Sequence, residues 1–285
     1  MAVIHRTRDG GVLRKKYRKA CWKSFWSNIR FRSIAQPVLQ YLLVAMLAWG
    51  MEDYLGGGIV GRGVCLGLHA WGLWKLLGAL LYQVRYALEN PSNEVGILRS
   101  GVQGERIALW ILRLLPGDYH IFPGLRVTDA KGSSEMDLVV LGPTGIFVVE
   151  TKNYKGKLTG DWSDHTLYKK RVKITRRALL WRIRREVGKP EETYSPLKQV
   201  GKQVYRLSRY LKGQGVDSWI QGCVWFVNPS LEIAVTNREG SPLPVFQQWK
   251  GASLRRYILR GENTLSRDTL EQAVSALDAL YTEQR

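Results

Sequence analysis

Four residues in the middle of the chain are of types that can bind a metal ion and activate water. They are the carboxylates Glu105, Asp137 and Glu150 and the lysine Lys152. Carboxylates hold a divalent cation, and a lysine beside them can orient water or stabilise negative charge. Whether the four residues can act on the same metal ion depends on the helices and strands that carry them.

The carboxylates of Asp137 and Glu150 are predicted to meet on a β-hairpin. Gly142-Pro143-Thr144-Gly145 is a turn signal between two apolar runs, which predicts strands over 136–141 and 145–152. A turn centred between Pro143 and Thr144 places Asp137 opposite Glu150. Like charges directly opposite each other repel, and the apolar run before Glu150 predicts a buried strand. A divalent cation would offset this repulsion, since Mg²⁺ is typically held by one or two carboxylates plus substrate phosphate.

Lys152 follows Glu150 by two residues, so strand alternation projects both side chains to one face. There the lysine could position or deprotonate an attacking water, or stabilise charge on a phosphate. An ordinary cross-strand salt bridge with Glu135, which the same register places opposite Lys152, is the alternative interpretation.

Glu105 is expected on a helix over 98–115, at the spacing of its apolar stripe. A carboxylate in a buried stripe is costly without a partner. One interpretation is that Glu105 points at the same metal ion as the hairpin. The alternative is a salt bridge to a basic residue of its own helix, namely Arg99, Arg106 or Arg113.

The rest of the second half predicts an α/β fold. Strands are expected over 119–127 and 222–228, with short strands near 157–162 and 169–174. Ser195 as N-cap and Pro196 at the first helical position predict a helix that ends at Gly213. An amphipathic helix is expected over 266–281.

These motifs resemble the PD-(D/E)xK nuclease superfamily, and within it the NERD (nuclease-related domain) family. The similar segments are Gly104-Glu105, the run 135–140, the run 145–154, the run 155–158 and the run 195–199. The resemblance covers about 93–228, and the run 146–154 is its most specific part. One departure is Leu138, where the family usually has histidine.

The resemblance implies a restriction-endonuclease-like core of order α-β-β-β-α-β. It implies that Asp137 and Glu150 bind Mg²⁺ or Mn²⁺ with help from Glu105, and that Lys152 acts on water or phosphate. It also implies that Gln199 sits on the helix beside the site; a plain surface glutamine is equally compatible with the sequence.

The charge of the chain predicts a polyanionic partner. The formal net charge is +19, from 43 Lys and Arg against 24 Asp and Glu. One basic cluster lies in 169–189 and continues on the next helix. The residues expected to hold nucleic acid, DNA in the first place, are Lys169, Lys170, Arg171, Lys173, Arg176, Arg177, Lys202 and Arg206. Contacts to the phosphate backbone without sequence readout are expected; a solvated charge run or a contact with anionic lipid is the alternative.

The N-terminal part divides into a basic segment, 1–36, and a hydrophobic helical hairpin, 37–88, ahead of a nuclease-like domain over 93–285. Residues 34–51 carry no charge, which suits a bilayer span. The second stretch contains Arg62 and Lys75. Basic flanks and an acidic turn place both ends in the cytoplasm by the positive-inside rule. We therefore expect membrane contact through residues 37–84; a helix pair packed in a cytoplasmic protein is the alternative.

Cys21, Cys65 and Cys223 are too scattered for a disulfide scaffold, so no disulfide partner is expected. Together these patterns predict a metal-dependent nuclease of DNA or RNA, tethered at the cytoplasmic face of a membrane. The alternative is a catalytically inactive protein of the same fold that binds DNA or anionic lipid there. The sequence leaves open the strand preference, the choice between endo- and exonuclease action, and the oligomeric state.

Overall fold

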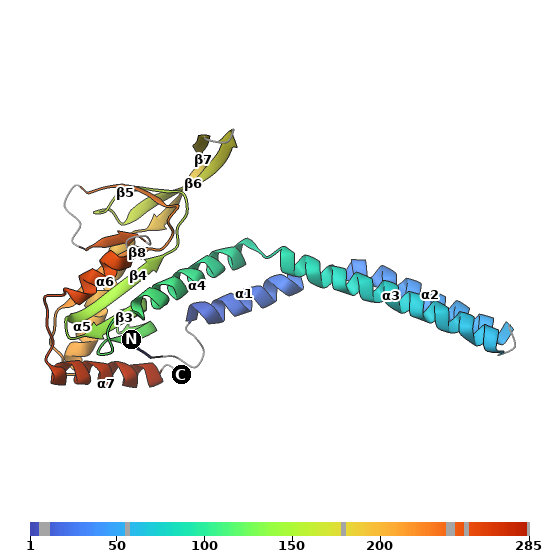
Figure 1. Ribbon diagram of the computed structural model, residues 1–285, viewed down its shortest axis with the longest axis horizontal. Coiled ribbons are helices and arrows are strands. Elements are labelled where there is room, and N and C mark those ends of the chain that lie inside the picture. Colours follow the sequence, from blue (N-terminus) through green and yellow to red (C-terminus); the bar gives the residue numbers. More distant parts are fainter. Residues whose placement is uncertain (6–11, 55–57, 178–180, 238–242, 248–250, 284–285) are drawn as a thin grey trace. The chain divides into compact units, whose positions relative to one another are not determined.

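The computed structural model describes residues 1–5, 12–54, 58–177, 181–237, 243–247 and 251–283. The chain divides into two compact units (Figure 1). The first comprises Met1–Lys15 and Arg99–Arg285, and the second is Lys16–Leu98. Helices α1 (Val12–Asn28) and α4 (Asn93–Leu112) run across the boundaries between them. The first unit is of mixed α/β type, as the sequence predicted.

The hairpin predicted around Pro143 and Thr144 is confirmed. Strand β3 spans Gly132–Gly142 and β4 spans Gly145–Lys152. Their antiparallel register runs from Gly142 opposite Gly145 to Leu138 opposite Val149. Gly145 has φ +132°, a conformation open to glycine, so its position allows the tight turn.

Strands β3 and β4 lie inside a six-stranded sheet of described residues with the order β1-β2-β3-β4-β8-β10. The other members are β1 (Val3–Ile4), β2 (His120–Asp129), β8 (Ile220–Phe226) and β10 (Val245–Gln247). Strand β4 pairs antiparallel with β3 and parallel with β8. Strand β4 is paired on both edges, and its apolar residues are buried on both faces, as the unbroken hydrophobic run predicted.

Helices cover both faces of this sheet. One core cluster joins α4 and α6 (Gly251–Leu259) to side chains such as Leu138 and Val149. The other joins α5 (Pro196–Gly213) and α7 (Arg267–Glu283) to side chains such as Val139 and Val148. By strand alternation from Val148, Glu150 and Lys152 belong to the face covered by α5.

A second sheet has the order β7-β6-β5-β9. It is built from β5 (Lys157–Asp161), β6 (Thr166–Arg177), β7 (Trp181–Tyr194) and β9 (Glu232–Thr236). The short strand expected near 169–174 is in fact part of a long antiparallel hairpin, β6–β7, which projects from this sheet (Figure 1). The prediction was too short because the segment is basic on both faces and lacks the alternation of a half-buried strand.

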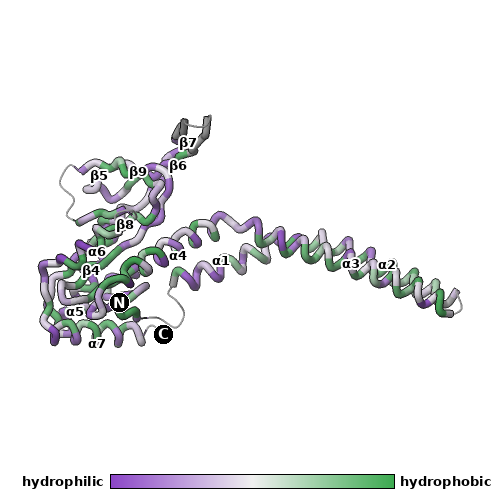
Figure 2. Tube along the Cα trace, in the orientation of Figure 1, coloured by the Kyte–Doolittle hydropathy of each residue, from purple (hydrophilic) through white to green (hydrophobic). Residues whose placement is uncertain are grey.

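The second unit contains the two apolar helices α2 (Phe31–Tyr54) and α3 (Ile59–Glu89), which form an antiparallel hairpin. Small residues lie at the contact: the thiol of Cys65 donates to the carbonyl oxygen of Ala48 at 2.9 Å, and a Cβ on Gly72 would lie 2.8 Å from Tyr41. Both helices are hydrophobic along much of their length (Figure 2). Large apolar side chains on them are exposed, including Leu43, at 55%, and Leu81, at 60%.

Three elements after Asn228 were not predicted: β9, β10 and α6. Each is short, and β9 and β10 are edge strands of their sheets, so their hydrophobic patterns are weak.

The predicted N-cap of α5 is confirmed in position only. Ser195 precedes the first residue of α5, yet its hydroxyl makes no capping hydrogen bond and is buried.

Candidate metal centre

The predicted site lies where strands β3 and β4 separate. Their ladder ends with Leu138 opposite Val149, one pair before the position at which Asp137 was expected to face Glu150. Strand β4 continues beside β8 as far as Lys152 opposite Phe226. The two strands thus form a fork, and the carboxylates follow its last hydrogen-bonded pair.

Asp137 is held in this fork by the residue after Glu150. The backbone N–H of Thr151 donates to Oδ2 of Asp137 at 2.7 Å, and the Thr151 hydroxyl donates to the same oxygen at 2.9 Å. Burial raises the pKa of Asp137, and Lys152 and these hydrogen bonds oppose the increase. Thr151 is therefore a supporting residue that the sequence interpretation did not identify.

Glu150 is almost fully buried, with 1% of the residue exposed, and two donors hold it. The ammonium of Lys152 donates to Oε1 at 2.5 Å, and the amide of Gln203 donates to Oε2 at 2.7 Å. Burial and the nearby charge of Asp137 raise the pKa of Glu150, while Lys152 lowers it. Burial acts to lower the pKa of Lys152, but the facing carboxylates raise it above its usual value.

Helix α5 contributes two glutamines, one turn apart, to this arrangement. Gln199 accepts a hydrogen bond from Lys152 Nζ at 2.9 Å, so the structure places it at the site rather than on a plain surface. Gln203 also donates to the carbonyl oxygen of Glu135 at 2.8 Å and is 1% exposed. It was missed by sequence reasoning, although it stands three residues after Val200 in the buried stripe, where a polar residue needs a partner.

Glu105 reaches the same region from α4. Its pKa is raised to about 8, chiefly by burial and then by the charges of Asp137 and Glu135, with a smaller contribution from Glu150. Arg14 lowers it. Among the described residues Glu105 forms no ion pair with the arginines of its own helix, the alternative that the sequence allowed. Glu105 therefore interacts electrostatically with Asp137 and Glu150, although it lies on α4, a helix that covers the face of the sheet opposite to α5.

Replacing Glu105 with glutamine should stabilise the metal-free protein at alkaline pH. The pKa of Glu105 is above its ordinary value of 4.5, so the folded state retains a proton that the unfolded state releases. Stability of the wild type therefore falls as pH rises from about 4.5 to about 8. We expect Glu105→Gln to remove part of this slope and to gain about 1–3 kcal/mol above pH 8. Denaturation of both proteins in chelator across this range measures it; parallel profiles would contradict it.

Gly104 sets how closely α4 approaches the end of β4. A Cβ at this position would lie 3.2 Å from Cβ of Asn153 and 3.3 Å from Cγ2 of Val227. Asn153 in turn donates to the carbonyl oxygen of Ser100 at 2.8 Å. We expect Gly104→Val to push the helix outward, cost about 1–3 kcal/mol of stability and lower the raised pKa of Glu105. Gly201→Val, at a helical position with open space around it, is the matched control. Equal effects of the two changes on stability would contradict a specific role of Gly104 in the packing of α4.

The residues at the fork suit an oxygen-ligated metal ion. The amide oxygen Oε1 of Gln203, beside Glu150, is buried without a hydrogen-bond partner in the described part of the chain. The carboxylates and this oxygen are hard donors of the kind that Mg²⁺ and Mn²⁺ use. No three Asp, Glu, His or Cys side chains of the described residues enclose a ready-made metal site. Two carboxylates completed by a substrate phosphate fit that arrangement better than a closed protein cage.

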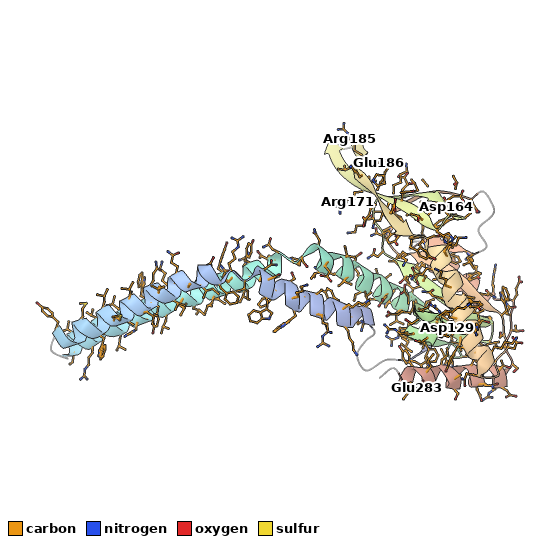
Figure 3. The ribbon with its side chains drawn as sticks, turned by 180° about the vertical axis from the view of Figure 1, so that it is seen from behind. Asp129, Asp164, Arg171, Arg185, Glu186 and Glu283 are labelled. Atoms are coloured by element: carbon orange, nitrogen blue, oxygen red, sulfur yellow. The ribbon has the colours of Figure 1, made fainter. Side chains whose placement is uncertain are left out.

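The basic residues predicted to hold nucleic acid divide into two groups. Lys169, Lys170 and Arg171 lie on the projecting hairpin β6–β7, whose outer part carries Arg185 and Glu186 (Figure 3). The ammonium of Lys169 lies 3.2 Å from Glu191, and that of Lys170 lies 2.9 Å from Glu186. The side chains of three further predicted residues, Lys173, Arg176 and Arg177, lie outside the described residues.

Lys202 and Arg206 lie on α5, outside the fork. Lys202 Nζ is 4.9 Å from the centre of the Tyr194 ring. Arg206 binds the turn between β2 and β3, through Ser134, the carbonyl oxygen of Lys131 and the carboxylate of Asp129. Arg206 therefore anchors α5 to the sheet in addition to carrying charge.

The fold and the fork define an α/β domain with a buried carboxylate–lysine centre. The model of the nuclease-related domain (NERD) family matches residues 100–227, which confirms the family resemblance drawn from the motifs. A stretch of 62 residues is 37% identical to an uncharacterized protein of Bacillus anthracis. This alignment covers 21% of the chain and 29% of the Bacillus protein, less than a third of that relative's length. No solved structure matches the chain.

Proposed function

We propose that this chain is a metal-dependent nuclease that hydrolyses phosphodiester bonds of DNA or RNA at the cytoplasmic face of a membrane. The observation that carries the proposal is the cluster at the strand fork, where Lys152 binds Glu150 and both interact electrostatically with Asp137. The match of residues 100–227 to the nuclease-related domain supports it. So does the element order, in which α4, β2, β3 and β4 precede α5 and β8. This order agrees with an α-β-β-β-α-β core into which β5, β6 and β7 are inserted.

Each residue of the fork has a role in this proposal. Asp137 and Glu150 would hold Mg²⁺ or Mn²⁺, with Glu105 as a further oxygen donor. When bound, such an ion polarises phosphate and lowers the pKa of water. Lys152 would turn from Glu150 toward the scissile phosphate and stabilise its negative charge. Gln199 would keep the ammonium in place, and Gln203 would orient Glu150.

Cleavage of labelled single- and double-stranded DNA and RNA by the full chain tests the proposal. We expect cleavage in Mg²⁺ or Mn²⁺ and none in chelator. Asp137→Asn and Glu150→Gln should each reduce the rate about 10²-fold or more. Calorimetric titration of the metal should show binding by the wild type and a loss in Asp137→Asn. Absence of cleavage of every substrate with either ion, despite metal binding, would favour a nucleic-acid-binding protein instead.

The outward-facing side chains of α2 and α3 support the membrane tether. In α2, 6% of the apolar window Ser33–Met51 is buried. In α3, 11% of the apolar window within Ile59–Glu89 is buried. A hairpin with small residues at its helix contact and large apolar residues outside suits lipid as its surroundings. Lys75 follows the start of α3 by sixteen residues, about 24 Å along the helix. It would thus lie near the inner edge of a core about 30 Å thick, where its ammonium can reach the headgroups.

The hairpin β6–β7 and helix α5 support a polyanionic substrate. Both elements belong to the unit that contains the fork. Their lysines and arginines would contact the phosphate backbone, which every nucleic acid presents, so binding should weaken as salt is raised. The phosphate charge does not depend on base sequence, so binding without sequence readout is expected.

A further inference from the structure

A cavity of about 510 Å³ lies beside α5, within the nuclease-like unit. Two of its lining residues, Lys198 and Lys202, immediately precede Gln199 and Gln203 in the sequence, so the cavity adjoins the helix face that carries the fork glutamines. Asp129, at the end of β2, contributes to its lining and is labelled beside α5 in Figure 3. The volume falls in the range of small-molecule sites, roughly 300–1,000 Å³.

Aromatic rings and apolar side chains form much of the lining. Tyr194 and Tyr205 are 42% and 54% exposed. The ring of His165 is nearly parallel to that of Tyr194, with 6.4 Å between their centres. Leu197 and Leu243 complete the apolar part of the lining. Flat exposed rings of this kind are the platforms on which nucleobases stack, and stacking accepts any base.

Positive charge surrounds these rings. The lining contains Lys131, Lys198, Lys202 and Arg206, against one acidic residue, Asp129. The Asp129 carboxylate already accepts a hydrogen bond from the backbone N–H of Lys131 and lies 3.4 Å from Nε of Arg206. Lys202 Nζ lies over the Tyr194 ring, 4.9 Å from its centre, and the guanidinium of Arg209 lies over the Tyr205 ring at 5.8 Å, so a cation stands over one face of each ring. A ligand that fits must combine a flat aromatic group with an anion.

We propose that this cavity binds a single nucleotide, its base against Tyr194 and Tyr205 and its phosphate at Lys198 and Lys202. The role of the site rests on the proposed nuclease function: it would hold an unpaired base of the substrate beside the cleavage centre. A free nucleotide offers the same chemistry. A base paired within a duplex is stacked between its neighbours and cannot enter without leaving them, so the site favours single-stranded nucleic acid.

The test is a binding titration of the full chain in detergent micelles with chelator present, so that no cleavage takes place. The probes are adenosine 5′-monophosphate, inorganic phosphate, a short single-stranded oligonucleotide and the same oligonucleotide as a duplex. We expect the monophosphate to bind more tightly than phosphate alone, and the single strand to compete with it. Tyr205→Ala and Lys202→Ala should each weaken the nucleotide by about fivefold or more. Tyr205→Phe should retain it.

Lys212→Ala is the matched control: this cation lies on the same helix, pairs with Asp217 at 3.2 Å and does not line the cavity. It should leave nucleotide binding unchanged. Tighter binding of the single strand than of the monophosphate assigns the site to the substrate strand, and the reverse assigns it to a free nucleotide. Equal affinity for phosphate and monophosphate, or equal losses in Tyr205→Ala and Lys212→Ala, would overturn the proposal. Because no metal is present, a chain that fails to cleave can still bind the nucleotide.

Discussion

If the chain is the proposed nuclease, Lys152→Met is expected to lower the rate of cleavage by about 10²–10⁴-fold at saturating metal. The substitution keeps the length of the side chain and removes the only charge that donates to Glu150 Oε1 among the described residues. The change also destabilises the metal-free protein, by about 3 kcal/mol, because it leaves a buried carboxylate without its ion pair. Rates from labelled substrate and denaturation in chelator measure the two effects separately.

Two further variants separate chemistry from folding. Lys152→Met combined with Glu150→Gln removes both charges of the pair and should recover most of the lost stability without recovering cleavage. Lys212→Met changes an exposed lysine, 68% accessible, and should leave both properties unchanged. Wild-type cleavage by a folded Lys152→Met protein would remove this lysine from the proposed chemistry.

For the proposed membrane tether, Leu43→Arg combined with Leu47→Arg is expected to release the protein from membranes. Both leucines lie on α2, four residues apart on one face, and are 55% and 63% exposed. An arginine near the middle of a span costs about 2.5–3.5 kcal/mol on insertion scales, so two cost about 6 kcal/mol. The wild type should resist alkaline carbonate extraction from membranes, whereas the double variant should be extracted or aggregate.

Leu114→Arg with Leu259→Arg provides the control, since these leucines are exposed in the other unit, at 41% and 38%. This pair adds the same charge and should not change extraction. A double variant in α2 that remains as carbonate-resistant as the wild type would argue against a span there.

The orientation of the hairpin can be tested with Tyr54→Cys, at a position 90% exposed at the end of α2. A membrane-impermeant thiol reagent should label this cysteine from outside the cell.

The sequence by itself determined the features that depend on neighbours along the chain. The turn at Pro143 and Thr144 set the register of β3 and β4, and strand alternation put Glu150 and Lys152 on one face. Apolar spacing and the Ser195-Pro196 signal located α5. The motifs around these elements were specific enough to indicate the nuclease-related domain, which matches residues 100–227.

The tertiary structure decided what depends on how separate elements dock. It ended the β3–β4 ladder one pair early, which gave Asp137 the N–H of Thr151 instead of a strand partner. It brought Gln203 on α5 to Glu150. It also brought Glu105, on α4 at the opposite face of the sheet, close enough to Asp137 and Glu150 to interact with their charges. Hydrophobic patterns specify which face of an element is buried, but not which polar side chain will meet it there. That choice follows from the packing of α4 and α5 on the sheet, because a buried carboxylate is tolerated only where docking supplies its donors.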